Sequence, residues 1–142
     1  MNSLVIDATS NKIFLVIISS KNIYTSTHEN SKSNFDKLII LIDDFLKKNE
    51  ISINKIDQIY VNRGPGSFAG IRNSLSIVKG IHLTKNIDYF CFSYFDFLDI
   101  KSKNIKDLLQ KNMIKPPKWR ELPSLCNKYK IRKNLIKPLY IS

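Results

Sequence analysis

Apolar positions in the first part of the chain fall into three short runs that indicate β-strands. Residues 4–10 begin as an apolar strand and end on Asp7 and small hydroxyl residues, and residues 13–18 are continuously apolar. Residues 23–27 alternate between apolar and polar side chains, as a strand with one buried face does. Because tight turns separate the three runs, we predict an antiparallel three-strand meander.

Two longer segments have helical spacing. Residues 33–49 place apolar side chains on one side of a helix, and Ser33 with Asp36 forms a start like a capping box. The second helix is predicted at residues 68–84. We also predict strands at 56–62 and 87–93 and the start of a further helix at 94–100. A strand, a helix and a strand in this order favour a parallel crossover, so the sequence predicts an α/β fold with a mixed sheet.

The first predicted helix contains five consecutive apolar residues, 38–42, which point in every direction around its axis. A helix that is apolar all round is buried on more than one side. In a chain of 142 residues, the second side is covered either by the C-terminal tail or by another polypeptide.

The glycines of the chain are concentrated at one turn. Gly64, Gly66, Gly70 and Gly80 lie in or just after the stretch Arg63-Gly-Pro-Gly-Ser-Phe-Ala-Gly-Ile-Arg72. The stretch lacks the Lys-Ser/Thr of a Walker loop, the dinucleotide-binding spacing and the Gly-x-Ser-x-Gly elbow. Ser67 is therefore better interpreted as the N-cap of the following helix than as a nucleophile.

Two interpretations of this turn fit the sequence. Backbone N–H groups at a helix start attract a phosphate or carboxylate, whereas glycines also allow a purely structural close approach. Candidate phosphate or nucleotide contacts are Arg63, Gly64, Pro65, Gly66, Ser67, Phe68, Gly70 and Arg72. Asp7 could serve such a site as a magnesium-side or phosphate-side acid, but we favour an Asx turn or cap that closes the hairpin.

Positive charge is concentrated in the last third of the chain. The net charge is +11, with 11 Lys+Arg and 10 Asp+Glu in residues 1–100 against 12 and 2 in residues 101–142. Basic residues mixed with aromatics suit RNA, and the candidate RNA contacts are Lys118, Trp119, Arg120, Lys130, Arg132 and Lys133. The alternative is a strap whose aromatics pack on the first lobe while its lysines stay solvated.

Cysteine content and hydropathy indicate the compartment. Cys91 and Cys126 form neither a disulfide framework nor a metal-ligand cluster, and Cys91 lies in an apolar strand where a thiol acts as a small hydrophobe. The chain has no leader pattern and no run of about 18 apolar residues of the kind that spans a membrane. We expect a cytoplasmic protein that binds no metal and does not associate with a membrane.

The glycine-rich turn and the helix after it resemble the signature of the TsaB (YeaZ) family, Gly-Arg-Gly-Pro-Gly-Ser-Phe-Thr-Gly-Leu/Val-Arg followed by a helix ending in Lys-Gly. Ten positions match: Arg63, Gly64, Pro65, Gly66, Ser67, Phe68, Gly70, Arg72, Lys79 and Gly80. Asn62 and Ala69 depart from the pattern. The resemblance implies a ribonuclease-H-like, actin-like ATPase lobe at residues 1–100 and a basic, proline-containing remnant of a second lobe at residues 101–142.

The resemblance also implies a function. In this family the subunit does no chemistry; it pairs through two long helices with a TsaD-type catalytic subunit, which holds ATP and a metal ion for tRNA threonylcarbamoyladenosine formation. A TsaE-type ATPase joins the pair, tRNA is contacted indirectly or through the tail, and the lone chain binds no cofactor and can form a homodimer. The interface implied here is Phe35, Leu38, Ile39, Ile40, Ile42, Ile71, Leu75 and Val78. Two alternatives remain: a small nucleotide-binding, actin-like domain with residual ATPase activity, and an RNA-binding module that uses the tail.

Overall fold

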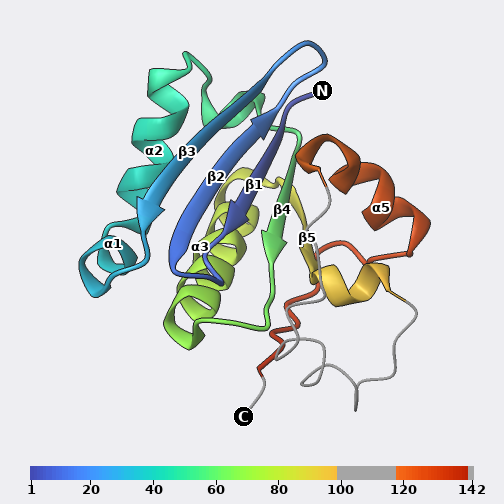
Figure 1. Ribbon diagram of the computed structural model, residues 1–142. Coiled ribbons are helices and arrows are strands. Elements are labelled where there is room, and N and C mark those ends of the chain that lie inside the picture. Colours follow the sequence, from blue (N-terminus) through green and yellow to red (C-terminus); the bar gives the residue numbers. More distant parts are fainter. Residues whose placement is uncertain (99–117, 141–142) are drawn as a thin grey trace.

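A computed structural model describes residues 1–98 and 118–140, apart from the side chain of Phe35 (Figure 1). Its centre is one five-stranded sheet in the order β3-β2-β1-β4-β5. The strands are β1 (Ser3–Asp7), β2 (Lys12–Ile18), β3 (Ile23–Glu29), β4 (Gln58–Asn62) and β5 (Asp88–Phe92). Strands β1, β2 and β3 pair antiparallel, whereas β4 pairs parallel with both β1 and β5. The predicted mixed sheet with its three-strand meander is confirmed.

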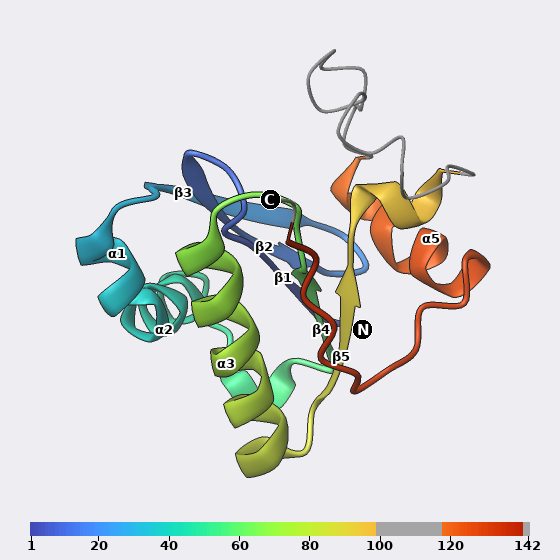
Figure 2. The ribbon, with the colours of Figure 1, turned by 90° about the horizontal axis from the view of Figure 1, so that it is seen from below.

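Three helices cover one face of the sheet: α1 (Lys32–Asp36), α2 (Leu38–Lys48) and α3 (Phe68–Lys85) (Figure 2). Alternate residues of the strands face these helices, and a continuous core forms between the two layers. The predicted helix at 33–49 is interrupted at Lys37, whose backbone is not helical. The second predicted helix is a single element, as expected.

The opposite face of the sheet is covered over part of its width. Tyr94–Phe97 forms a 3₁₀ turn, and Trp119–Glu121 leads into a short helix, α5 (Leu122–Lys128). Leu122 and Cys126 of α5 are buried against Tyr60 and Phe92 of the sheet. The predicted helical start at 94–100 is thus a 3₁₀ turn, and residues 99–100 lie outside the described part of the chain.

The segment after α5 runs along the edge of β5 (Figure 2). The N–H of Asn134 donates to the carbonyl of Tyr89 at 2.7 Å, and the Asn134 side chain accepts from the N–H of Tyr89 at 3.0 Å. Further along, the N–H of Leu139 donates to the carbonyl of Arg63 at 2.8 Å. The described part of the tail therefore follows the strap interpretation and protects an edge that would otherwise be open. Among the described helices, none is long and apolar enough to cross a membrane.

Candidate functional site

Polar side chains meet where the adjacent parallel strands β1 and β4 end. Asp7 closes β1, Asn62 closes β4, and the Asn62 amide donates to Oδ2 of Asp7 at 3.1 Å. The hydroxyl of Tyr94 donates to the same oxygen at 2.9 Å. The backbone N–H and the hydroxyl of Thr9 donate to Oδ1 at 3.1 and 2.7 Å. Asp7 is buried, and its carboxylate is held entirely by neutral donors within the described residues.

This arrangement confirms the Asx turn at Asp7, because the carboxylate binds the backbone two residues further on. Burial, together with the neighbouring carboxylate of Asp7, raises the pKa of Tyr94, so its hydroxyl remains a proton donor. A cavity of about 420 Å³ opens beside the site and is lined by Asp7, Tyr94 and Trp119, among others. Within the described residues, no group of three His, Cys, Asp or Glu side chains could hold a metal ion.

The three glycines of the turn are close to the protein's own backbone. A Cβ at Gly64 would overlap the carbonyl oxygen of Leu139, one at Gly66 that of Thr9, and one at Gly70 that of Ala8. Gly64 also has a φ of +114°, which side chains rarely adopt. These positions therefore require glycine for packing within the chain itself.

The start of α3 is capped from within the chain. The hydroxyl of Ser67 accepts from the N–H of Gly70 at 3.2 Å, which confirms the predicted N-cap. The N–H of Ser67 donates to the carbonyl of Thr9 at 2.8 Å, and the N–H of Gly64 donates to the side chain of Asn62 at 2.9 Å. Three N–H groups of the candidate phosphate loop thus already have internal acceptors.

The remaining residues of the turn divide between interior and surface. Arg63 is buried and forms a two-pronged ion pair with Asp96, with Nη2 2.6 Å and Nε 3.2 Å from the carboxylate oxygens. Pro65 is half-buried, whereas Phe68 and Arg72 are exposed and lie against each other, the guanidinium 5.5 Å from the ring centroid. Sequence reasoning missed Asp96, because it lies 33 residues from Arg63 and outside any motif.

The predicted partner interface needs a correction. Five of its residues lie in the core between the helices and the sheet and are inaccessible to a partner: Leu38, Ile42, Ile71, Leu75 and Val78. Only Ile39 and Ile40 are on the surface, with exposed fractions of 58% and 54%. The reason is geometric, since neighbouring residues of a helix point about 100° apart and one side of α2 faces the sheet. The side chain of Phe35 lies outside the description.

Two residues of α3 leave apolar or open surface. Sequence reasoning missed Leu83, which is 72% exposed. Gly80, which the sequence suggested as a place for close approach of another element, has no described atom beyond its own helix backbone within 4 Å of the place where a Cβ would be. Glycine in a helix interior costs about 1 kcal/mol relative to alanine. The fold of the described chain therefore offers no steric reason for glycine at position 80, unlike position 70 of the same helix.

The candidate RNA contacts do not all behave alike. Trp119 is half-buried, with its ring 6.2 Å from that of Phe14, so it anchors the strap. Arg120 donates to the carbonyl of Ser19 at 3.1 Å. Lys118, Lys130, Arg132 and Lys133 are exposed, and their contact with RNA stays a prediction.

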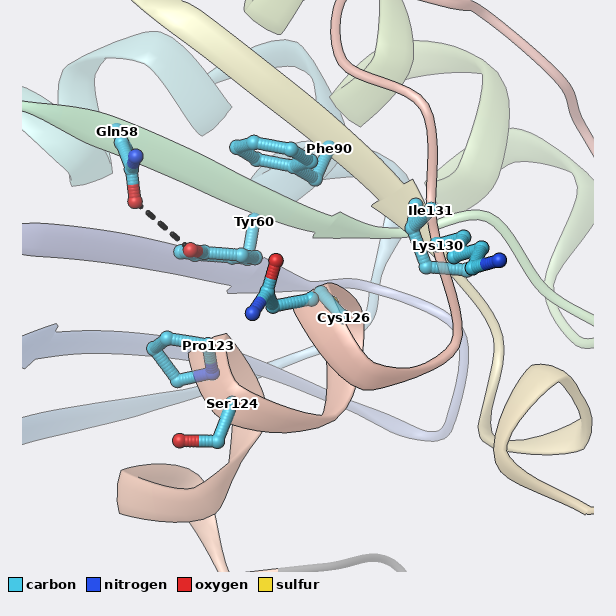
Figure 3. Close-up of a pocket in the computed structure, with 9 residues that line it drawn as sticks. Gln58, Tyr60, Phe90, Pro123, Ser124, Cys126, Lys130 and Ile131 are labelled. Carbon is cyan, nitrogen blue, oxygen red and sulfur yellow. Dashed lines mark hydrogen bonds between the residues drawn. The ribbon is translucent and has the colours of Figure 1, made fainter.

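A cavity of about 480 Å³ lies between α5 and strands β4 and β5 (Figure 3). The rings of Tyr60 and Phe90 stack there with centroids 5.1 Å apart, and the Tyr60 hydroxyl donates to Gln58 at 2.8 Å. Burial raises the pKa of Tyr60 and of Cys126 to about 12, and that of Cys91 to about 11. Both thiols therefore stay protonated at neutral pH and act as core residues, as predicted for Cys91.

Comparison with known proteins gives one consistent set of relatives. A family model described as "TsaD: tRNA N6-adenosine threonylcarbamoyltransferase" matches residues 21–96. The tRNA threonylcarbamoyladenosine biosynthesis protein TsaB of Buchnera aphidicola subsp. Baizongia pistaciae is 38% identical over 71 residues, which are 44% of this chain and 32% of the relative. Its namesake from Buchnera aphidicola subsp. Schizaphis graminum is 26% identical over 99 residues, which are 70% of this chain and 47% of the relative.

Solved structures agree on the fold. YeaZ from Pseudomonas aeruginosa superposes with a TM-score of 0.61 at 17% identity, over 75% of this chain and 50% of that one. A second structure, described as similar to peptidase YeaZ from the same organism, gives a TM-score of 0.62 at 18% identity, over 68% of this chain and 45% of that one. The chain therefore has the actin-like ATPase fold that was expected, and it spans half or less of the length of these relatives.

Proposed function

The chain belongs to the TsaB (YeaZ) family, and on this premise we propose that it is a non-catalytic partner subunit in tRNA threonylcarbamoyladenosine formation. Its partner is a TsaD-type catalytic subunit, which holds ATP and the metal ion. The pair works in the cytoplasm, with a TsaE-type ATPase as a further member. Without its partner, the chain pairs with a second copy of itself.

The observation that carries this proposal is the outer surface of the two helices. Ile39 and Ile40 in the first turn of α2 and Leu83 in the last turn of α3 are exposed large apolar side chains, and both helices cover the same face of the sheet. A monomer that keeps three such side chains in water forgoes about 1.5–3 kcal/mol for each one that a partner could bury. We call Ile39, Ile40, Gly80 and Leu83 the outer helix face.

Gly80 indicates what kind of partner binds this face. A glycine that nothing in the described chain approaches leaves room for a backbone to pack closely against α3. Another helix is the natural occupant, because small residues let two helix axes approach each other. The described part of the tail does not take this place. It runs along β5 and ends with the ring of Tyr140 4.7 Å from that of Phe68 in the first turn of α3, whereas Gly80 lies near the end of that helix.

The polar site at the ends of β1 and β4 supports the proposal that this subunit is non-catalytic. Each oxygen of the Asp7 carboxylate already accepts two hydrogen bonds from neutral donors. The glycine-rich turn is filled by the backbone of the chain itself. An acid that orients a nucleotide-bound metal would need lone pairs directed into the cavity. The lone pairs of Asp7 are instead used by donors of the chain itself.

The test is co-purification with the TsaD-type protein from the same cell. Ile40→Glu puts a charge on the outer helix face and is expected to abolish the complex, while the melting temperature of the lone chain stays within about 2 °C because the site is exposed. Thr25→Glu is the matched control, since Thr25 is exposed on β3 and outside that face. A complex that survives Ile40→Glu with unchanged affinity would contradict the proposal.

A further inference from the structure

A small cavity of about 200 Å³ beneath the strap has a strongly basic lining. Arg63, Lys130, Arg132 and Lys137 line it together with a single carboxylate, that of Asp96. Because Asp96 is already paired with Arg63, the three other cations have no counter-charge in the lining. All three are exposed, so their charged ends can reach a ligand at the mouth of the cavity. We call this cavity the basic pocket.

The cavity between α5 and the sheet lies next to the basic pocket. Lys130 and Ile131 line both cavities, so the two adjoin at these residues; Figure 3 shows them at the edge of the cavity beside α5. The second cavity has a half-buried ring, Phe90, and the hydrogen-bonding side chains of Ser124 and Asn127. We call it the aromatic pocket. A cationic site and an aromatic site with polar edges therefore lie side by side.

Lys130 occupies a backbone position that favours glycine. It follows the last turn of α5 with a φ of +56°, and the N–H of Ile131 closes that turn on the carbonyl of Cys126 at 3.0 Å. Glycine is the usual residue at this point of a helix end. A lysine at this position is conformationally less favourable than a glycine, so the backbone gives no reason for it. Its side chain, however, lines both pockets.

We propose that the basic and aromatic pockets together bind single-stranded RNA, with a backbone phosphate at Lys130, Arg132 and Lys137 and an adjacent unpaired base at Phe90. Charge complementarity supports the phosphate contact, since residues 118–140 carry seven Lys+Arg and one acidic residue. The base contact is supported by the lining of the aromatic pocket. Its ring can stack on the face of a base, and its amide and hydroxyl groups can hydrogen-bond to the edge. The choice of RNA over DNA rests on the proposed function.

This site shares Lys130 and Arg132 with the contacts expected from the sequence and differs in its other residues. Trp119 and Arg120 are used within the fold, whereas Arg63, Phe90 and Lys137 come to the site only through folding. The aromatic pocket lies on the side of the sheet that α5 covers and the basic pocket beside the tail at β5, and none of their lining residues belongs to the outer helix face. Binding of RNA can therefore be measured on the lone chain, and its failure would leave the pairing with a TsaD-type subunit untouched.

The experiment is fluorescence anisotropy of the full chain with a labelled ten-nucleotide single-stranded RNA at several salt concentrations. Lys130→Gly suits the backbone, so the melting temperature is expected to stay equal or rise, while the slope of log K against log salt falls by about 0.7 for one lost phosphate contact. Lys21→Gly removes one exposed positive charge from a distant turn and is expected to leave the slope unchanged. Lys137→Gln is a second variant of the basic pocket, and it is expected to lower the slope by the same amount as Lys130→Gly.

The base contact is tested by Phe90→Leu, which keeps an apolar side chain in the sheet and removes the ring. It is expected to weaken binding about fivefold or more, as loss of one stacked base does. Equal effects of Lys130→Gly and Lys21→Gly would overturn the proposal, because the binding would then be diffuse attraction. Competition by poly-glutamate as effective as that by RNA would overturn it in favour of an acidic protein. Tighter binding of DNA of the same sequence would overturn the choice of RNA.

Discussion

Two glycines of α3 give opposite predictions for the same substitution. Gly80→Ala adds a methyl group where no described atom beyond the helix's own backbone lies within 4 Å, so it gains the helix propensity of alanine without a clash. The expected gain is about 1 kcal/mol in the free energy of unfolding, or about 3–4 °C in the melting temperature of a domain of this size. Gly70→Ala places its methyl group on the carbonyl of Ala8 and is expected to cost about 2 kcal/mol or more.

Gly80→Ala is expected to weaken the complex with the TsaD-type subunit, although it stabilises the lone chain. If a helix of the partner packs against Gly80, one added methyl group overfills the contact at a cost of about 1–3 kcal/mol. That cost weakens pairing by roughly five-fold to more than a hundred-fold. A variant that is more stable alone and weaker in the complex separates docking from folding.

The measurements are thermal unfolding of the lone chain by circular dichroism and titration calorimetry with the purified partner. Ser124→Ala serves as the control, because it also raises helix propensity but lies on α5, on the opposite face of the sheet. A Gly80→Ala chain that is stabilised and pairs with undiminished affinity would refute the reasoning that a backbone packs at this position.

Three further predictions concern the stability of the fold. Asp96→Asn leaves the buried Arg63 guanidinium without its counter-charge, and urea unfolding is expected to show a loss of about 3–5 kcal/mol. Ser67→Ala removes the cap of α3 and is expected to cost about 1 kcal/mol by the same assay, whereas Ser67→Gly costs only a few tenths. Folding raises the pKa of Cys91 from 9.0 to about 11 and that of Cys126 to about 12, so both groups disfavour the folded state once the unfolded thiols ionise. Stability is therefore expected to be complete below pH 9 and to fall between pH 9 and 12, and thermal melts that stay constant across that range would contradict the sign.

Local signals in the sequence were sufficient for the secondary structure of the first lobe. Continuous apolar runs mark buried strands, and the sheet contains strands at all five predicted places. Ser67 as N-cap and the Asx turn at Asp7 were predictable because both involve residues two or three positions apart. The resemblance of the turn to the TsaB signature rests on the same kind of short-range pattern.

Long-range packing decided what the sequence left open. The apolar run at 38–42 predicted a surplus of apolar surface, but only folding shows that Leu38 and Ile42 face the sheet while Ile39 and Ile40 face outward. Four glycines look alike in the sequence, yet three touch the backbone of distant segments and Gly80 touches nothing in the described chain.

The sequence of this chain by itself determined which residues form strands and helices, and where the chain turns. Only the tertiary structure decided which side chains remain for a partner or a ligand. The physical reason is that periodicity reports which residues share one side of an element, whereas exposure depends on what packs against that side. Asp96 reaches Arg63, and the carbonyl of Lys137 accepts from the same guanidinium at 3.4 Å, through contacts that no local pattern encodes.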